Sequence, residues 1–128
     1  MEDAMHLICR RCSTRLTGEL KMVPFDTRNE AVEENFLDCG TSMLAEKVFD
    51  HDDRAGNYIA NIADGQHMKL TDDSRRLNGC CGLDGCDGPN LQCELCGTYV
   101  ATKRTDCWTP HYIVFDQSTT QAMMSFGE

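Results

Sequence analysis

The spacing of apolar and polar residues predicts a chain built mainly of short β-strands. Leu16 to Val23 places Leu16, Leu20 and Met22 on one face and ends at Pro24, since proline cannot extend a paired strand. Tyr58 to Ile62 is a second strand, closed by a turn at Ala63-Asp64-Gly65. Gln66 to Leu70 follows that turn directly, which predicts a hairpin. Two more strands are expected late in the chain, over Thr98 to Thr102 and over Tyr112 to Asp116.

Signals for helices are few. Thr27 to Glu30 has the form of a capping box, which predicts a short helix over Arg28 to Leu37; a strand edge is the alternative there. Met43 to Phe49 fits either type of element. A length of 128 residues suits one domain. The expected fold class is therefore mainly β, with at most one or two short helices, in a single small domain over residues 1–128. Residues 117–128 carry no strong pattern, and we expect a frayed tail there.

The nine cysteines point to metal chemistry rather than to disulfides. A disulfide framework favours an even count and a secreted chain, whereas this count is odd and no signal peptide is recognisable near Met1. In a reducing compartment, closely paired cysteines are more often metal ligands. The cysteines stand at positions 9, 12, 39, 80, 81, 86, 93, 96 and 107.

Two matched Cys-x-x-Cys pairs predict a zinc site. Two residues between cysteines let one tight turn present both sulfurs to one ion, and two such pairs complete the tetrahedral sphere that zinc prefers. The pairs also share their surroundings, because a small residue, a threonine, a variable residue, an apolar residue and another small residue follow each. A redox pair or free cysteines would not explain this repetition. The expected ligands are Cys9, Cys12, Cys93 and Cys96, and the segment between the pairs is expected to fold as a large insertion.

A second zinc ion is a further hypothesis. The segment from Gly79 to Asn90 is rich in glycine and turn residues, and it offers little core in which to bury cysteines. Three thiolates would come from Cys80 or Cys81, from Cys86 and from Cys107, and the fourth ligand from Cys39 or His111. The alternatives are that these cysteines are small residues buried under a tight loop, or that Cys107 is a catalytic nucleophile beside His111 or Asp106.

Charge restricts the classes of partner. The formal net charge of −9 repels phosphate backbones, so nucleic acid is not the expected partner. No stretch approaches the roughly 20 apolar residues of a membrane span. We therefore expect a cytoplasmic protein that does not enter a membrane.

The layout resembles the β-tent superfamily, which includes Yippee-like proteins, the ligand-binding domain of cereblon-type proteins and methionine sulfoxide reductases of the B type. The resemblance rests on the early pair Cys9/Cys12, the late pair Cys93/Cys96 and a strand after each. It implies a β-rich fold around one zinc ion. The chain departs from the family in having a single tryptophan and no Arg-x-Cys-x-Asn near its end, so no catalytic residue is carried over. The Gly79-to-Asn90 and Asp106-to-His111 segments also resemble a small family of uncharacterised bacterial proteins, which implies no function.

These observations favour a zinc-stabilised binding module that recognises a protein and performs no catalysis. One alternative is a thiol-dependent oxidoreductase of the methionine sulfoxide reductase B kind with Cys107 as nucleophile. A second alternative is a zinc-ribbon nucleic-acid binder. The sequence does not identify the partner, the pathway or the oligomeric state.

Overall fold

A computed structural model describes residues 4–23, 29, 34–44, 57–79, 82–83, 89–105 and 110–125. Over these ranges the chain is mainly β, as predicted, with nine strands and two short 3-10 helices. The strands are β1 (Ala4–Cys9), β2 (Leu20–Met22), β3 (Thr41–Leu44), β4 (Tyr58–Ala60), β5 (Met68–Leu70), β6 (Leu91–Cys93), β7 (Tyr99–Arg104), β8 (Tyr112–Phe115) and β9 (Thr120–Ser125), and the helices are η4 (Ile62–Asp64) and η5 (Ser74–Arg76).

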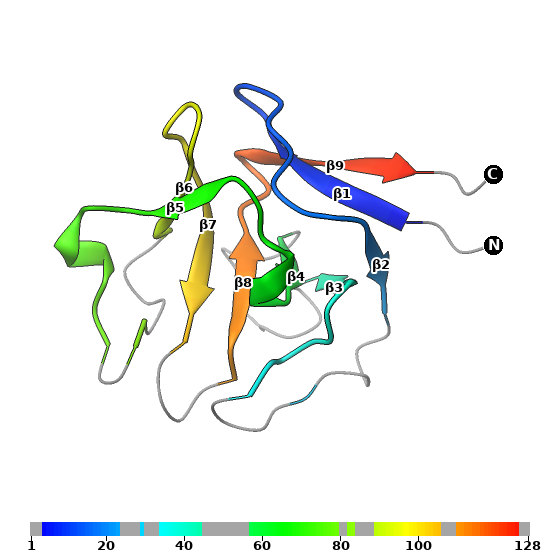
Figure 1. Cartoon of the computed structure of the whole chain (residues 1–128), viewed down its shortest axis with the longest axis horizontal. Helices are drawn as coiled ribbons and strands as arrows, with labels where there is room; N and C mark the ends of the chain where they lie inside the picture. Colours follow the sequence, from blue (N-terminus) through cyan, green and yellow to red (C-terminus); the bar gives the residue numbers. More distant parts are fainter. Residues whose placement is uncertain are drawn as a thin grey trace.

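All nine strands belong to one sheet, in the order β5-β6-β7-β8-β4-β3-β2-β1-β9. Neighbouring strands are antiparallel except for β2 and β3. The sheet curls, so that β1 and β6 approach each other at one end although five strands stand between them in the order (Figure 1). A bridge between Thr17 and Gly65 closes the curl, and the Gln66 N–H donates to the Leu16 carbonyl over 2.7 Å.

Two apolar clusters cover the two faces of this sheet. Alternation along β1 sends Met5, Leu7 and Cys9 to one face, where they are buried, and leaves the residues between them partly exposed. The first cluster collects these residues with buried side chains of β6, β7 and β8, including Val100 and Phe115. The second cluster lies on the opposite face and consists of Phe36, Leu37, Met43, Ile59, Tyr112 and Val114. The curl therefore encloses the first cluster, and the cysteines of the predicted zinc site lie at its end.

Several predicted elements are confirmed and others are corrected. Strands form within Tyr58 to Ile62 and at β7 and β8, as expected. The predicted hairpin of Gln66 to Leu70 with Tyr58 to Ile62 is wrong, because β5 pairs with β6. The reason is the Asn61 side chain, which accepts a hydrogen bond from the Ala63 N–H and starts η4, so the chain leaves the sheet instead of turning back.

Two other predicted elements are also corrected. The tail expected at residues 117–128 contains β9, which pairs with β1 along its whole length from Thr120 to Ser125. The sequence predicts a helix over Arg28 to Leu37. In the described part of this range, residues 29 and 34–37, no helix forms, because Asn35 makes a parallel bridge with His111. Within the described ranges, no helix is both long enough and apolar enough to cross a membrane.

Candidate metal centre

The first Cys-x-x-Cys pair forms a tight turn at the end of β1. The Cys9 N–H donates to the Thr14 carbonyl over 2.9 Å, and the Ser13 N–H donates to the Cys9 carbonyl over 2.8 Å. Ser13 has a φ of 65°, a left-handed conformation that glycine adopts most readily. We call this turn, residues 9–14, the first knuckle.

The second pair repeats this geometry at the end of β6. The Cys93 N–H donates to the Thr98 carbonyl over 2.8 Å, and the Gly97 N–H donates to the Cys93 carbonyl over 2.8 Å. Gly97 has a φ of 79°, so it occupies the place that Ser13 has in the first turn. This is the second knuckle, residues 93–98. The small residue after each pair, seen in the sequence, therefore stands where the backbone is left-handed.

The four sulfur atoms come together between the knuckles. Cys9 Sγ lies 3.6 Å from Cys96 Sγ, and Cys12 Sγ lies 3.5 Å from Cys93 Sγ. All four sulfurs lie within 4.8 Å of one another. A zinc ion bound at about 2.3 Å to each of four thiolates sets neighbouring sulfurs about 3.8 Å apart by tetrahedral geometry. The four cysteines are therefore spaced so that they could hold one metal ion.

In each knuckle, a threonine hydroxyl lies within hydrogen-bonding distance of the sulfur of the second cysteine. The Thr14 hydroxyl lies 2.9 Å from Cys12 Sγ, and the Thr98 hydroxyl lies 3.2 Å from Cys96 Sγ. Hydrogen bonding by Thr98 lowers the pKa of the Cys96 thiol to about 6, and hydrogen bonding by Thr14 lowers the pKa of Cys12. These hydroxyls favour the thiolate form, which is the form that binds metal.

The pKa of the first cysteine of the first knuckle shifts in the opposite direction. Cys9 is buried, and its burial raises the pKa of its thiol to about 11. A charged thiolate at this position needs a compensating cation, because desolvation penalises the charged form. A divalent metal held by all four sulfurs would provide that compensation.

His67 ties the two knuckles together, which sequence reasoning missed. Its Nδ1 lies 2.9 Å from the carbonyl of Arg15, just after the first knuckle, and its own carbonyl accepts from the Glu94 N–H over 2.9 Å. His67 has a φ of 54°, which lets the chain turn between η4 and β5. No pattern in the sequence marks this role, since a lone histidine after Asp64-Gly65-Gln66 looks like an ordinary turn residue.

The second metal site hypothesised from the sequence falls largely outside the described residues. Its candidate ligands outside the described ranges are Cys80, Cys81, Cys86 and Cys107. The alternative role of Cys107 as a nucleophile therefore also falls on a residue outside those ranges. Cys39 is exposed in the turn before β3, and the His111 backbone pairs with residues 34–36. Within the described part of the chain, neither belongs to a group of three or more potential ligands.

Comparisons with known protein families, with curated proteins and with solved structures found no match to this chain. The resemblance to the β-tent superfamily stays a prediction, and the function must be argued from the site itself.

Proposed function

We propose that this chain is a binding module without catalytic activity, that a structural zinc ion joins its two knuckles, and that a protein partner docks on the knuckle surface. The observation that carries the proposal is the group of four sulfurs at tetrahedral spacing, drawn from β1 and β6. Thiolate ligands in a tetrahedral set favour zinc over harder cations. Four protein ligands fill the coordination sphere, so the ion has no open position for a substrate or for an activated water molecule.

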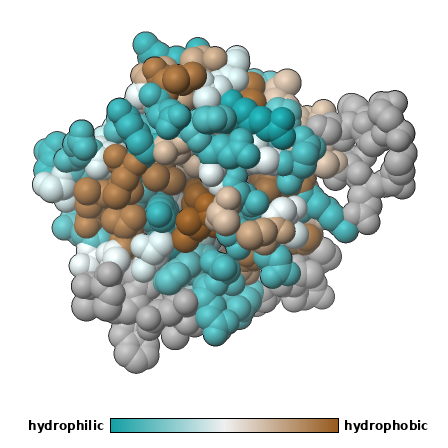
Figure 2. All heavy atoms as spheres, viewed as in Figure 1, coloured by the Kyte–Doolittle hydropathy of each residue, from teal (hydrophilic) through white to brown (hydrophobic). Residues whose placement is uncertain are grey.

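The proposed docking surface consists of the two knuckle tips. Leu95 stands in the second knuckle with 74% of its side chain exposed, and Figure 2 shows apolar atoms at the top of the view, where Figure 1 has the turn between β6 and β7. Arg10 and Arg11 are exposed on the neighbouring tip. Arginine and large apolar side chains are enriched at protein interfaces. A partner segment that combines an apolar residue with acidic residues would complement this surface.

The metal makes these tips suitable for recognition. Turns that zinc holds in place lose little conformational entropy on binding, and such preorganisation increases affinity. Thiolate ligands also need a reducing environment, so we place the protein in the cytoplasm.

The test is capture with the zinc-loaded protein from a cell lysate, carried out with and without nuclease treatment. Wild type is compared with Leu95→Asp and with Leu70→Asp, which changes a 43% exposed leucine on β5. We expect a captured protein to be lost with Leu95→Asp and kept with Leu70→Asp. Capture that Leu95→Asp leaves unchanged would refute the docking surface, and capture that nuclease abolishes would favour the nucleic-acid alternative.

A further inference from the structure

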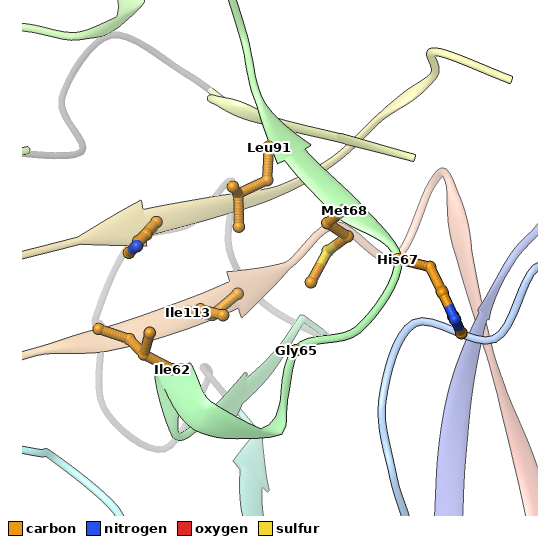
Figure 3. Close-up of a pocket in the computed structure, with 7 residues that line it drawn as sticks. Ile62, Gly65, His67, Met68, Leu91 and Ile113 are labelled. Atoms are coloured by element: carbon orange, nitrogen blue, oxygen red, sulfur yellow. The ribbon is translucent and has the colours of Figure 1, made fainter. Parts of the chain in front are cut away.

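A pocket of about 170 Å³ opens on the face of the sheet that carries the first apolar cluster. Figure 3 shows the Met68, Leu91 and Ile113 side chains directed into one space, while the His67 ring points away from it toward the first knuckle. Gly65 forms part of the wall without a side chain. The lining residues are Ile62, Gly65, His67, Met68, Leu91, Lys103 and Ile113.

Lys103 gives this apolar pocket a positive charge. It stands two residues after Ala101 on β7, so the two side chains share a face of the strand, and Ala101 is fully buried in the first cluster. Lys103 also lies opposite Ile113 in the ladder between β7 and β8. The Lys103 ammonium has no hydrogen bond or ion pair with the part of the chain that the structure describes. Lys103 is only partly buried, so its charged end stays accessible to an anion at the mouth of the pocket.

The backbone of Lys103 is held in place by a buried side chain. Asn90 is fully buried; its Oδ1 accepts from the Lys103 N–H over 2.8 Å and its Nδ2 donates to the Lys103 carbonyl over 3.1 Å. This pair of bonds joins the two strands one residue before β6 begins at Leu91. Asn90 is therefore a positioning residue that sets the base of the Lys103 side chain at the pocket.

We propose that this pocket binds a small carboxylate with a branched aliphatic group. The lining side chains are aliphatic or thioether, which favours an apolar body, and Lys103 supplies the charge that pairs with the carboxylate. The volume matches a single small group, since a cavity of roughly 150 Å³ holds benzene. This inference goes beyond the proposed function and does not depend on a protein partner. The carboxylate could belong to a free acid or to the C-terminal leucine of a peptide.

The experiment is a titration of the zinc-loaded, methyl-labelled protein with 4-methylpentanoate, followed by the NMR signals of Ile62, Met68, Leu91 and Ile113. We expect saturable shifts with a dissociation constant on the order of 1 mM, a typical affinity for so small a ligand. The neutral 4-methylpentanamide should bind at least about tenfold more weakly in the same protein, because it lacks the charge. Lys103→Gln should weaken binding of the acid by a similar factor.

Two further variants separate charge at the pocket from other effects. Lys69→Gln removes a lysine from β5, where side chains alternate between the faces, so that Lys69 points away from its pocket-lining neighbour Met68; it should bind the acid as wild type does. Gly65→Ala should weaken binding of both ligands, because the added Cβ would come within 2.8 Å of Met68 Cε and 3.2 Å of Ile113 Cδ1. Gly65 has a φ of −72°, which alanine adopts freely, so the chain should still fold.

Either of two outcomes would overturn the proposal: no saturable shift of the pocket methyl groups with the acid, or equal affinity for the acid and the amide in the wild-type protein. The second comparison needs no variant. Titration with N-acetyl-glycyl-leucine and with its C-terminal amide distinguishes the two sources. Tighter binding of this peptide acid than of 4-methylpentanoate points to a peptide C-terminus, and weaker binding points to a free acid.

Discussion

Cys9 Sγ lies 3.6 Å from Cys96 Sγ, although 87 positions separate the two residues along the chain. Cys12 and Cys93 make the complementary contact, so each close pair of sulfurs contains one member from each knuckle. Neither knuckle can satisfy a metal ion alone. Binding of a metal ion by these sulfurs would therefore be coupled to the curl of the sheet, which brings β1 and β6 together.

Removal of the metal should destabilise the whole sheet. A ligand that binds only the folded state stabilises it by about 4 kcal/mol when its free concentration is 1,000 times its dissociation constant. We expect a strong chelator to lower the free energy of unfolding by at least this amount, measured by urea denaturation with and without added zinc. Elemental analysis of the purified protein should find zinc, and a stability that chelation leaves unchanged would exclude a structural metal.

Cys12→Ser should weaken metal binding, whereas Cys39→Ser should not. Both cysteines are exposed, so the two substitutions differ little in packing. Only Cys12 belongs to the group of four sulfurs. Substitution of Co²⁺ for zinc gives a direct measurement, since thiolate-to-cobalt charge transfer and visible d–d bands report the ligand set. We expect these bands to change and weaken with Cys12→Ser and to match wild type with Cys39→Ser.

Thr98→Val should reduce metal affinity by about 10- to 100-fold, the usual effect of removing a group that supports a metal ligand. The substitution keeps the shape of the side chain and removes the hydroxyl that lies 3.2 Å from Cys96 Sγ. Competition with a chromophoric zinc chelator measures the change. Thr102→Val, on β7, which begins directly after Thr98, is the control, and equal affinities for the two variants would mean that the Thr98 hydroxyl has no role.

Gly97→Ala should destabilise the protein by about 1 kcal/mol, because alanine resists the left-handed backbone that this position requires. An added Cβ at Gly97 would meet no described atom within 4 Å, so the effect is one of backbone conformation alone. Gly18→Ala is a matched control, since its Cβ would meet only Gln66 Nε2 at an ordinary 3.6 Å. Thermal unfolding of the zinc-loaded variants should show a lower Tm for Gly97→Ala only.

The number of zinc ions per chain tests the second site hypothesised from the sequence. If the four knuckle cysteines are the only ligands, one zinc is bound, and about five of the nine cysteines react with a thiol reagent in the folded protein before a chelator is added. Two zinc ions with one or two reactive thiols would instead assign the ligands around Cys86 and Cys107 to a second ion. Cys107→Ser should leave the knuckle zinc in place, and loss of a sulfoxide reductase activity in this variant would favour the oxidoreductase alternative.

The sequence predicted the metal centre better than the sheet. Each knuckle is a local structure, so its cysteines, small residue and threonine could be identified from their spacing alone. The partner of β5 could not be identified in this way, because Asn61 caps η4 and the chain leaves β4, so that β5 pairs with β6. β9 was missed because it lies at the edge of the sheet, where Met123 and Met124 are both partly exposed and blur the alternation. The role of His67 depends on two long-range contacts, one from its ring and one from its carbonyl, that leave no local pattern.

The pairing of β1 with its neighbours has a consequence for how the protein is made. β1 leaves the ribosome before every strand it pairs with, and its longest ladder, from Ala4 to Cys9, is with β9. The first knuckle is likewise translated well before Cys93 and Cys96, so until those residues are made it has only two of the four thiols that could hold a metal ion. If the four cysteines bind zinc as proposed, a nascent chain has an incomplete site, and slow translation or a shortage of zinc would leave its thiols open to oxidation.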